Sequence, residues 1–165
     1  MRLLATLDPE HTTEEERKTF RHRQATRAVV FDKEKNIALL FVSKKSFYKL
    51  PGGGIEPGES IENALHRECI EEIGTKIEVT GEVGSVIEYR KRYNLVQESF
   101  CYLARIVGEK GEPHFEEDEI ADGFQIKWMP LAEAIRLVKL NPLPTDYEGP
   151  FIQNRDLILL EEAGR

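Results

Sequence analysis

The feature that most constrains this chain is the stretch from Pro51 to Thr75, PGGGIEPGES followed by IENALHRECIEEIGT. Its three consecutive glycines let the backbone come close to a ligand or an ion. The segment after Ser60 has the apolar spacing of an amphipathic helix, and Ser60 and Gly74 are good residues to begin and to end it. The stretch therefore predicts a glycine loop that leads directly into a helix.

On such a helix each residue turns by roughly 100°, so two rows of side chains lie next to each other. Glu68 and Glu72 are i,i+4 neighbours, and Glu71 lies on the adjacent row, where its spacing from Arg67 permits a salt bridge. The bordering row is apolar and is expected to face the core; it consists of Ile61, Leu65, Cys69 and Ile73. The carboxylates are therefore expected at the edge of the core, partly desolvated.

A solvated acidic helix would explain Glu-x-x-Glu-Glu alone, but the whole stretch resembles the Nudix box. That motif has seven fixed positions, and all are matched: Gly53, Glu59, Arg67, Glu68, Glu71, Glu72 and Gly74. At about 7% usage per residue type, a chance match in such a chain is on the order of one in a million. Cys69 and Thr75 stand where the family usually has Leu, Ile or Val, and both are packing positions.

The order of elements predicts an α/β fold, an α/β/α sandwich around a mixed β-sheet, which the resemblance also implies. With 165 residues the chain is expected to form a single Nudix domain over 1–165. Residues 1–20 would be an N-terminal extension and 141–165 a C-terminal connector and helix. Residues 1–11 are expected to be a loose lead-in, and 76–89 a strand with a turn near Gly81 or Gly84. The segment that begins at Thr13 is either a short capped helix or a frayed acidic tail.

Composition excludes some classes of function. There is no run of about 18 apolar residues, so no membrane span is expected. The apolar stretch at the N-terminus is too short and too acidic for a secretion signal. Cys69 and Cys101 have no metal-site spacing, so a reduced, cytoplasmic setting is expected. The net charge of −7 argues against broad binding of nucleic acid. It does not exclude a small polyanionic substrate, because a bound cation reverses the local charge.

Carboxylates without His or Cys select hard cations, so Mg²⁺ is the expected cofactor and Mn²⁺ its substitute. Because Mg²⁺ usually binds through carboxylates and substrate phosphates together, a phosphorylated substrate is expected. Neighbouring carboxylates raise one another's pKa, so activity should need a divalent ion and rise into mildly alkaline pH.

The resemblance implies hydrolysis of a nucleoside diphosphate linked to another group. By motif position, the expected catalytic residues are Glu68, Arg67, Glu71, Glu72 and Glu59. The expected metal ligands are the Gly52 carbonyl, Glu68, Glu71, Glu72 and one further carboxylate from the acidic loop, Glu119 or else Glu117. Arg67 would orient Glu71, and which carboxylate acts as general base stays open.

Substrate contacts are expected from Arg27, Lys49, Gly53 and Gly54. The cluster Arg90-Lys91-Arg92 is either a hairpin tip over a phosphate or a solvated turn. Subfamily markers for ADP-ribose, NADH and coenzyme A are not visible, which leaves a nucleoside triphosphate pyrophosphohydrolase, acting on modified dNTPs for example. The alternatives are a dinucleoside polyphosphate or ADP-sugar hydrolase, a non-catalytic ligand sensor and a Nudix-fold isomerase. A homodimer is compatible with the resemblance.

Overall fold

A mixed seven-stranded sheet forms the centre of the computed structural model, which describes residues 1–165. The strands are β1 (Leu3–Leu7), β2 (Arg21–Phe31), β3 (Asn36–Val42), β4 (Phe47–Lys49), β5 (Lys76–Arg90), β6 (Leu95–Val107) and β7 (Phe124–Pro130). Their order is β1-β5-β6-β2-β3-β4, and β7 pairs with β3. The β1–β5 and β2–β6 pairs are parallel, and the other pairs are antiparallel.

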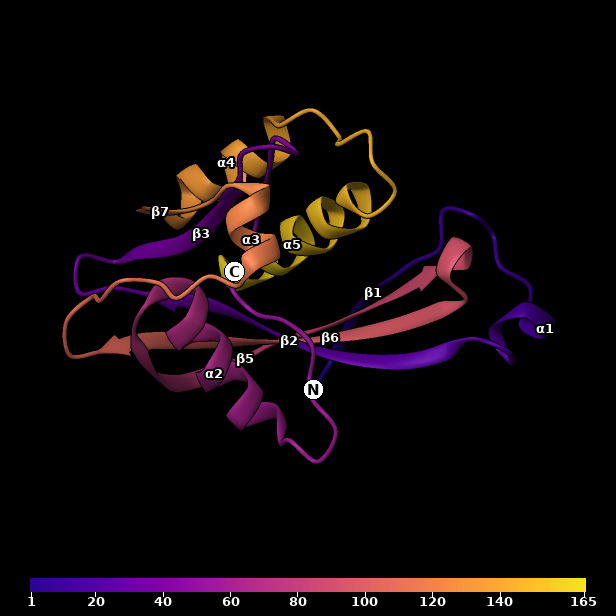
Figure 1. The fold of residues 1–165 in the computed structure, drawn as a ribbon, viewed down its shortest axis with the longest axis horizontal. Coiled ribbons are helices and arrows are strands. Elements are labelled where there is room, and N and C mark those ends of the chain that lie inside the picture. Colours follow the sequence, from indigo (N-terminus) through magenta and orange to yellow (C-terminus); the bar gives the residue numbers. More distant parts are fainter.

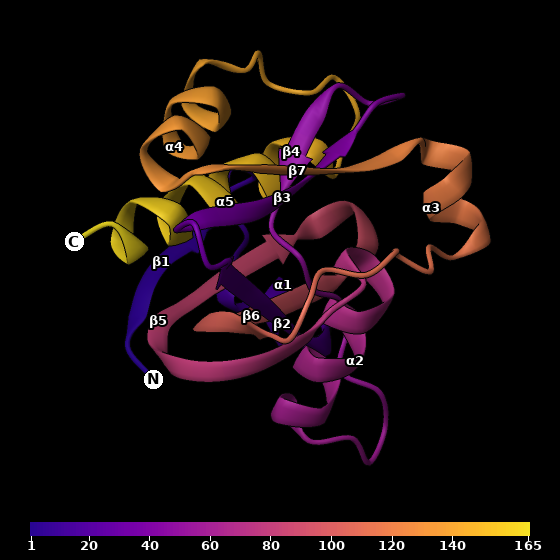
Figure 2. The ribbon, with the colours of Figure 1, turned by 90° about the vertical axis from the view of Figure 1, so that its left-hand side faces the viewer.

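Helices cover both faces of this sheet (Figures 1 and 2). The helices are α1 (Glu14–Arg17), α2 (Ile61–Ile73), α3 (Glu117–Asp122), α4 (Leu131–Leu140) and α5 (Gly149–Ala163), with a 3-10 turn at Lys91–Tyr93. Helix α2 packs against β2 and β5 on one face, whereas α4 and α5 pack against β3, β7, β4 and β5 on the other. The expected α/β/α sandwich is confirmed. None of the helices has the length and apolar character needed to cross a membrane.

Successive side chains of β2 point alternately into two separate hydrophobic cores. Ala28 and Val30 join the core under α2, together with Leu65, Cys69 and Ile73 of the predicted apolar row. Val29, between them, points to the opposite core under α4 and α5. Ile61, the first residue of the predicted row, is only half-buried. Because β2 is apolar on both faces, it can lie in the middle of a covered sheet.

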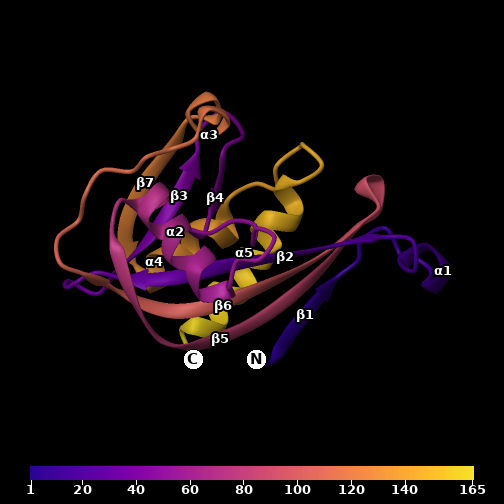
Figure 3. The ribbon, with the colours of Figure 1, turned by 60° about the horizontal axis from the view of Figure 1, so that its bottom comes forward.

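Strands β2, β5 and β6 continue beyond these cores as a long projection that carries α1 at its tip (Figure 3). The expectation of a loose lead-in is wrong, because Leu3–Leu7 forms β1 and pairs with the edge of β5. Helix α1 has the capping box that its sequence offers, with Thr13 and Glu16 bonded reciprocally. The acidic segment is therefore a helix in this structure.

No turn interrupts residues 76–90, so the expectation of a turn near Gly81 or Gly84 is also wrong. The pairing of β5 with β6 instead shifts register at two places, between Val79 and Gly81 and between Glu82 and Gly84. Such β-bulges insert an extra residue into one strand, and glycine tolerates the distorted backbone there. Gly84 has a φ of 153°.

A buried polar cluster lies between β5, β6 and α5. Both oxygens of Glu88 are used: Arg90 donates to one at 2.9 Å and Gln97 to the other at 2.8 Å. Arg155 of α5 lies 3.4 Å from Glu88 and donates to Asp156 at 2.7 Å. Burial by itself would raise the pKa of Glu88, but the charges of Arg155 and Arg90 hold it below its ordinary value. The cluster therefore joins α5 to the sheet through ionised groups.

The end of α2 supplies a test of backbone geometry. Gly74 has a φ of 65°, and a Cβ there would lie 2.5 Å from the carbonyl carbon and oxygen of Glu112. Gly58 has a φ of 80° with nothing within 4 Å of its Cβ position. We expect Gly74→Ala to reduce the free energy of unfolding by about 3 kcal/mol and Gly58→Ala by about 1 kcal/mol, since only the first adds a backbone clash. Urea titration of both variants measures the difference, and equal losses would contradict the packing at Gly74.

The Glu88 cluster predicts a pH-dependent stability. Because its folded-state pKa lies below the ordinary value of 4.5, ionised Glu88 stabilises the fold above that pH. This contribution is lost as the pH falls through the folded-state pKa. At pH 7, Glu88→Gln should cost about 3 kcal/mol, because breaking a buried pair leaves charge uncompensated. The cost relative to wild type should shrink in acid.

Urea titrations of wild type and variant at pH 7 and pH 3.5 measure this difference. The matched control is Glu78→Gln on the same strand, where Glu78 makes an exposed pair with Arg105. We expect a change below about 0.5 kcal/mol for this control at either pH. A Glu88→Gln cost that stays constant with pH would contradict an ionised, paired Glu88.

Candidate active site

The glycine loop is attached to the free edge of β2. Thr26 N–H donates to the Gly53 carbonyl at 2.9 Å, and Ala28 N–H donates to the Pro51 carbonyl at 3.0 Å. A side chain at Gly52 would collide with the Thr26 carbonyl, and one at Gly53 with the Glu68 carboxylate. The glycines are therefore needed so that the loop can pass between β2 and α2.

Glu72 is the most buried carboxylate of the box, with 1% of its surface exposed. One of its oxygens lies 2.7 Å from the Lys49 ammonium, and the other accepts the Gly52 N–H at 2.6 Å. The structure thus places Lys49 against a box glutamate. The Gly52 N–H is hydrogen-bonded to Glu72. The expected role of the Gly52 carbonyl as a metal ligand stays a prediction.

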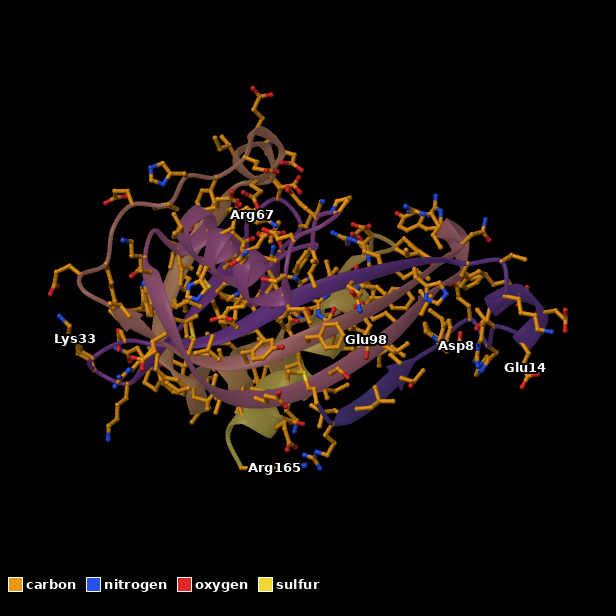
Figure 4. The ribbon with its side chains drawn as sticks, turned by 90° about the horizontal axis from the view of Figure 1, so that it is seen from below. Asp8, Glu14, Lys33, Arg67, Glu98 and Arg165 are labelled. Carbon is orange, nitrogen blue, oxygen red and sulfur yellow. The ribbon has the colours of Figure 1, made fainter.

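Arg67 connects the remaining acidic residues of the box. Its guanidinium donates to Glu59 at 3.0 Å, to Glu68 at 2.9 Å and to Glu71 at 3.2 Å. It also donates to the Gly54 carbonyl at 3.1 Å. The predicted Arg67–Glu71 bridge is confirmed, and Arg67 is seen to orient the loop as well. In Figure 4, Arg67 lies on α2, far from Asp8 and Glu14 at the end of the projection.

Helix α2, the glycine loop, α3 and α5 enclose a cavity of about 330 Å³, which Arg67 and Glu59 do not line. Its acidic wall contains Glu68, Glu71 and Glu72 from α2, and Glu116, Asp118 and Glu119 from the loop and α3. Glu119, the first choice for an extra carboxylate, therefore does reach the cavity, whereas Glu117 does not line it. Predicted substrate contacts Arg27, Lys49, Gly53 and Gly54 also line the cavity.

The acidic wall repels additional negative charge. Burial raises the pKa of Glu68, and the neighbouring charge of Glu72 raises it further. Burial likewise raises the pKa of Glu119 to about 7, with Glu72 again contributing. Carboxyl groups that face one another in a partly desolvated wall hold their negative charge poorly unless a cation joins them.

The donor set fits a hard divalent cation, although the side chains are not arranged around one. No group of three or more His, Cys, Asp or Glu side chains stands ready to hold a metal ion. Positive groups of the protein occupy the carboxylates instead, with Arg67 on Glu68 and Glu71 and with Lys49 on Glu72. The wall offers only oxygen donors, and such donors suit a hard divalent cation. Binding would require Lys49 to release Glu72.

The opposite wall of the cavity is basic and consists of Arg23, Arg27, Arg90 and Arg155. Burial lowers the pKa of Arg27 to about 10, and the positive charge of Arg155 contributes. Arg27 was expected here from its position on a strand. Arg90 is buried in this wall, so a wholly solvated Arg90-Lys91-Arg92 turn is ruled out for its first member.

Sequence reasoning missed Arg155 altogether. The available signal was an Arg-Asp pair inside the apolar run of residues 151–163, where charge is unexpected on a buried face. Nothing in that pattern indicates which cavity the arginine lines, because α5 is far from the box in sequence.

Comparison with known proteins agrees with the geometry. The family model described as NUDIX domain matches residues 21–150. An RNA pyrophosphohydrolase of Campylobacter jejuni (strain 81-176) is 36% identical over 72 residues, 41% of this chain and 46% of the relative. The nucleoside triphosphatase NudI of an Enterobacter species is 54% identical over 33 residues, 20% of this chain and 23% of the relative. The chain thus matches less than half the length of these two relatives.

Among solved structures, a NUDIX hydrolase from Nitrosomonas europaea aligns with a TM-score of 0.65 at 17% identity, covering 87% of this chain and 89% of that one. At this identity the likeness concerns the fold alone. The family model, by contrast, covers most of the chain and includes the loop, α2 and the acidic wall. The chain belongs to the NUDIX domain family.

Proposed function

We propose that this protein is a Mg²⁺-dependent pyrophosphohydrolase that cleaves a phosphoanhydride bond in a nucleotide. One observation carries the proposal: a single cavity has a wall of box carboxylates on one side and a wall of arginines on the other. The first wall suits a divalent cation and the second suits phosphate oxygens. A substrate with several phosphates can satisfy both walls at once.

The box residues would have distinct roles in binding the cation and activating water. Glu68, Glu71 and Glu72 hold the cation, with Glu119 as a further ligand from α3. Arg67 fixes Glu68, Glu71 and the Gly54 carbonyl, so that the wall keeps its shape. When bound, Mg²⁺ neutralises these carboxylates together with the substrate phosphates and acts as a Lewis acid on a phosphoryl oxygen. Glu68 or another box carboxylate accepts the proton of the attacking water.

Free nucleoside triphosphates are the first candidate substrates. A nucleoside triphosphatase is among the relatives, and the net charge of −7 offers no broad basic footprint for nucleic acid. The 5′-triphosphate end of RNA is the second candidate, supported by the relatives named RNA pyrophosphohydrolase. Both candidates present the same triphosphate chemistry to the cavity.

A catalytically silent ligand sensor fits the residues less well. All seven fixed positions of the box are present in the sequence. Their side chains also converge, since Arg67 contacts Glu59, Glu68 and Glu71 at once. The cysteine-dependent isomerase fits poorly too, because Cys69 and Cys101 are buried and burial raises the pKa of both thiols.

The test is release of phosphate or pyrophosphate from dNTPs, oxidised dNTPs, ADP-ribose, diadenosine polyphosphates and a 5′-triphosphate RNA. We expect turnover with Mg²⁺ and none with EDTA. Glu72→Gln should lower kcat about 100-fold or more, because the cation contributes several kcal/mol to such reactions. The matched control is Glu62→Gln on the same helix, since the Glu62 side chain is 76% exposed; we expect unchanged rates.

Loss of activity in both variants would point to a damaged fold rather than to a lost ligand. Turnover that persists in EDTA, or in Glu72→Gln, would overturn the metal mechanism. Tight binding of one compound without turnover of any would favour the sensor instead. The relative rates for dNTPs and triphosphate RNA decide between the two substrate candidates.

A further inference from the structure

The basic wall contains donor groups that the protein itself leaves unused. Three of its arginines are almost fully buried: Arg27, Arg90 and Arg155. Each has a buried nitrogen without a hydrogen-bond partner, namely Nε of Arg27, Nε of Arg90 and Nη2 of Arg155. Buried polar groups are nearly always paired, and each exception needs an explanation. All three arginines line the same cavity, so their positive charges can attract an anion that binds there.

Arg155 is held rigidly for this purpose. It is 1% exposed, and its Nε donates to Asp156 at 2.7 Å. The other oxygen of Asp156 accepts the Leu50 N–H at 2.8 Å, which ties α5 to the chain just before the glycine loop. Nη1 of Arg155 lies 3.4 Å from Glu88, so only Nη2 remains free. A guanidinium fixed at two points keeps its positive charge at the cavity wall, so a bound anion costs it little further side-chain entropy.

The arginines of the basic wall outnumber the carboxylates that pair with them. Its four arginines face two buried carboxylates, Glu88 and Asp156, with Glu148 3.5 Å from Arg90 at the exposed rim. Arg27 donates only to the Thr26 carbonyl, at 2.7 Å, and pairs with no carboxylate. A network that served only to hold α5 on the sheet would be expected to balance its charges and fill its donors.

We propose that Arg155, together with Arg27 and Arg90, binds one phosphate group of the substrate that the carboxylate wall does not reach, and that this selects substrates with at least three phosphates. This inference rests on the proposed function for the site and adds a specificity determinant to it. The carboxylates would hold a cation that neutralises the phosphates next to the cleaved bond, so a diphosphate-linked compound would leave the arginines empty. A triphosphate fills both walls. Arg155 lies beyond residues 21–150, which the family model matches, so the determinant comes from α5.

The first experiment measures binding of inorganic tripolyphosphate and of pyrophosphate by calorimetry, first in EDTA, where the carboxylate wall has no cation, and then with Mg²⁺. In EDTA either anion can place one phosphate on the arginines, so we expect both to bind. With Mg²⁺ we expect tripolyphosphate, which reaches both walls, to bind about tenfold more tightly than pyrophosphate. Arg155→Lys keeps a positive charge but loses the guanidinium fork, and it should weaken tripolyphosphate binding about tenfold. The control is Arg105→Lys, an exposed arginine paired with Glu78 outside the cavity.

A second variant covers the case in which Arg155→Lys does not fold. Arg23 lines the same wall, but it is exposed and donates to Gln97 at 2.8 Å, so Arg23→Gln spares the core. It should reduce tripolyphosphate affinity severalfold with unchanged circular dichroism. Affinities equal to wild type in every folded cavity variant would overturn the proposal, as would equal binding of tripolyphosphate and pyrophosphate with Mg²⁺.

Steady-state kinetics separates this inference from the proposed function. If the enzyme is active, Arg155→Lys should raise KM for a nucleoside triphosphate about tenfold, with a smaller change in kcat and little change in KM for ADP-ribose. A merely structural role would affect both substrates alike and would overturn the inference while leaving the hydrolase intact. Conversely, tripolyphosphate binding without any turnover would support the anion site and contradict the hydrolase.

Discussion

The contact on which the site depends is the burial of Glu72 against the glycine loop. Its two oxygens hold the Gly52 N–H and the Lys49 ammonium, so one side chain joins α2, the loop and the end of β4. A carboxylate that is 1% exposed is costly unless it is paired and hydrogen-bonded, and both conditions are met here. Side chains at Gly52 and Gly53 would collide with the Thr26 carbonyl and with the Glu68 carboxylate, so the loop can approach Glu72 this closely only because both residues are glycine.

The burial of Glu72 also places its negative charge close to the other carboxylates of the acidic wall. Burial and the neighbouring charge of Glu72 raise the pKa of Glu68 and of Glu119, and Arg67 and Lys49 offset these effects only in part. Lys49 and Arg67 thus form ion pairs with carboxylate oxygens that a divalent cation would bind. Arg67 and Lys49 offset part of the negative charge locally. A divalent cation that binds Glu72 would have to displace the Lys49 ammonium from it.

How far sequence predicts such a molecule depends on whether a feature is local. The caps of α2, its apolar row and the Arg67–Glu71 bridge follow from spacing within one helix, and the structure confirms them. The strand at Leu3–Leu7 was missed because its partner is β5, far along the chain. The bulges at Gly81 and Gly84 were mistaken for a turn, since glycine permits both and only strand pairing distinguishes them.

The candidate site divides in the same way. Half of its acidic wall lies on α2 and could be predicted from a motif, whereas its basic wall is assembled from β2, β5 and α5. Arg90 and Arg155 come together only because both pair with Glu88 beneath the cavity. Different elements of the fold therefore position the two walls. The proposed cation ligands come from α2 and α3, while the positions of the arginines depend on where α5 docks on the sheet. A chain can thus keep the chemistry of the box and change its substrate by altering the residues that α5 presents.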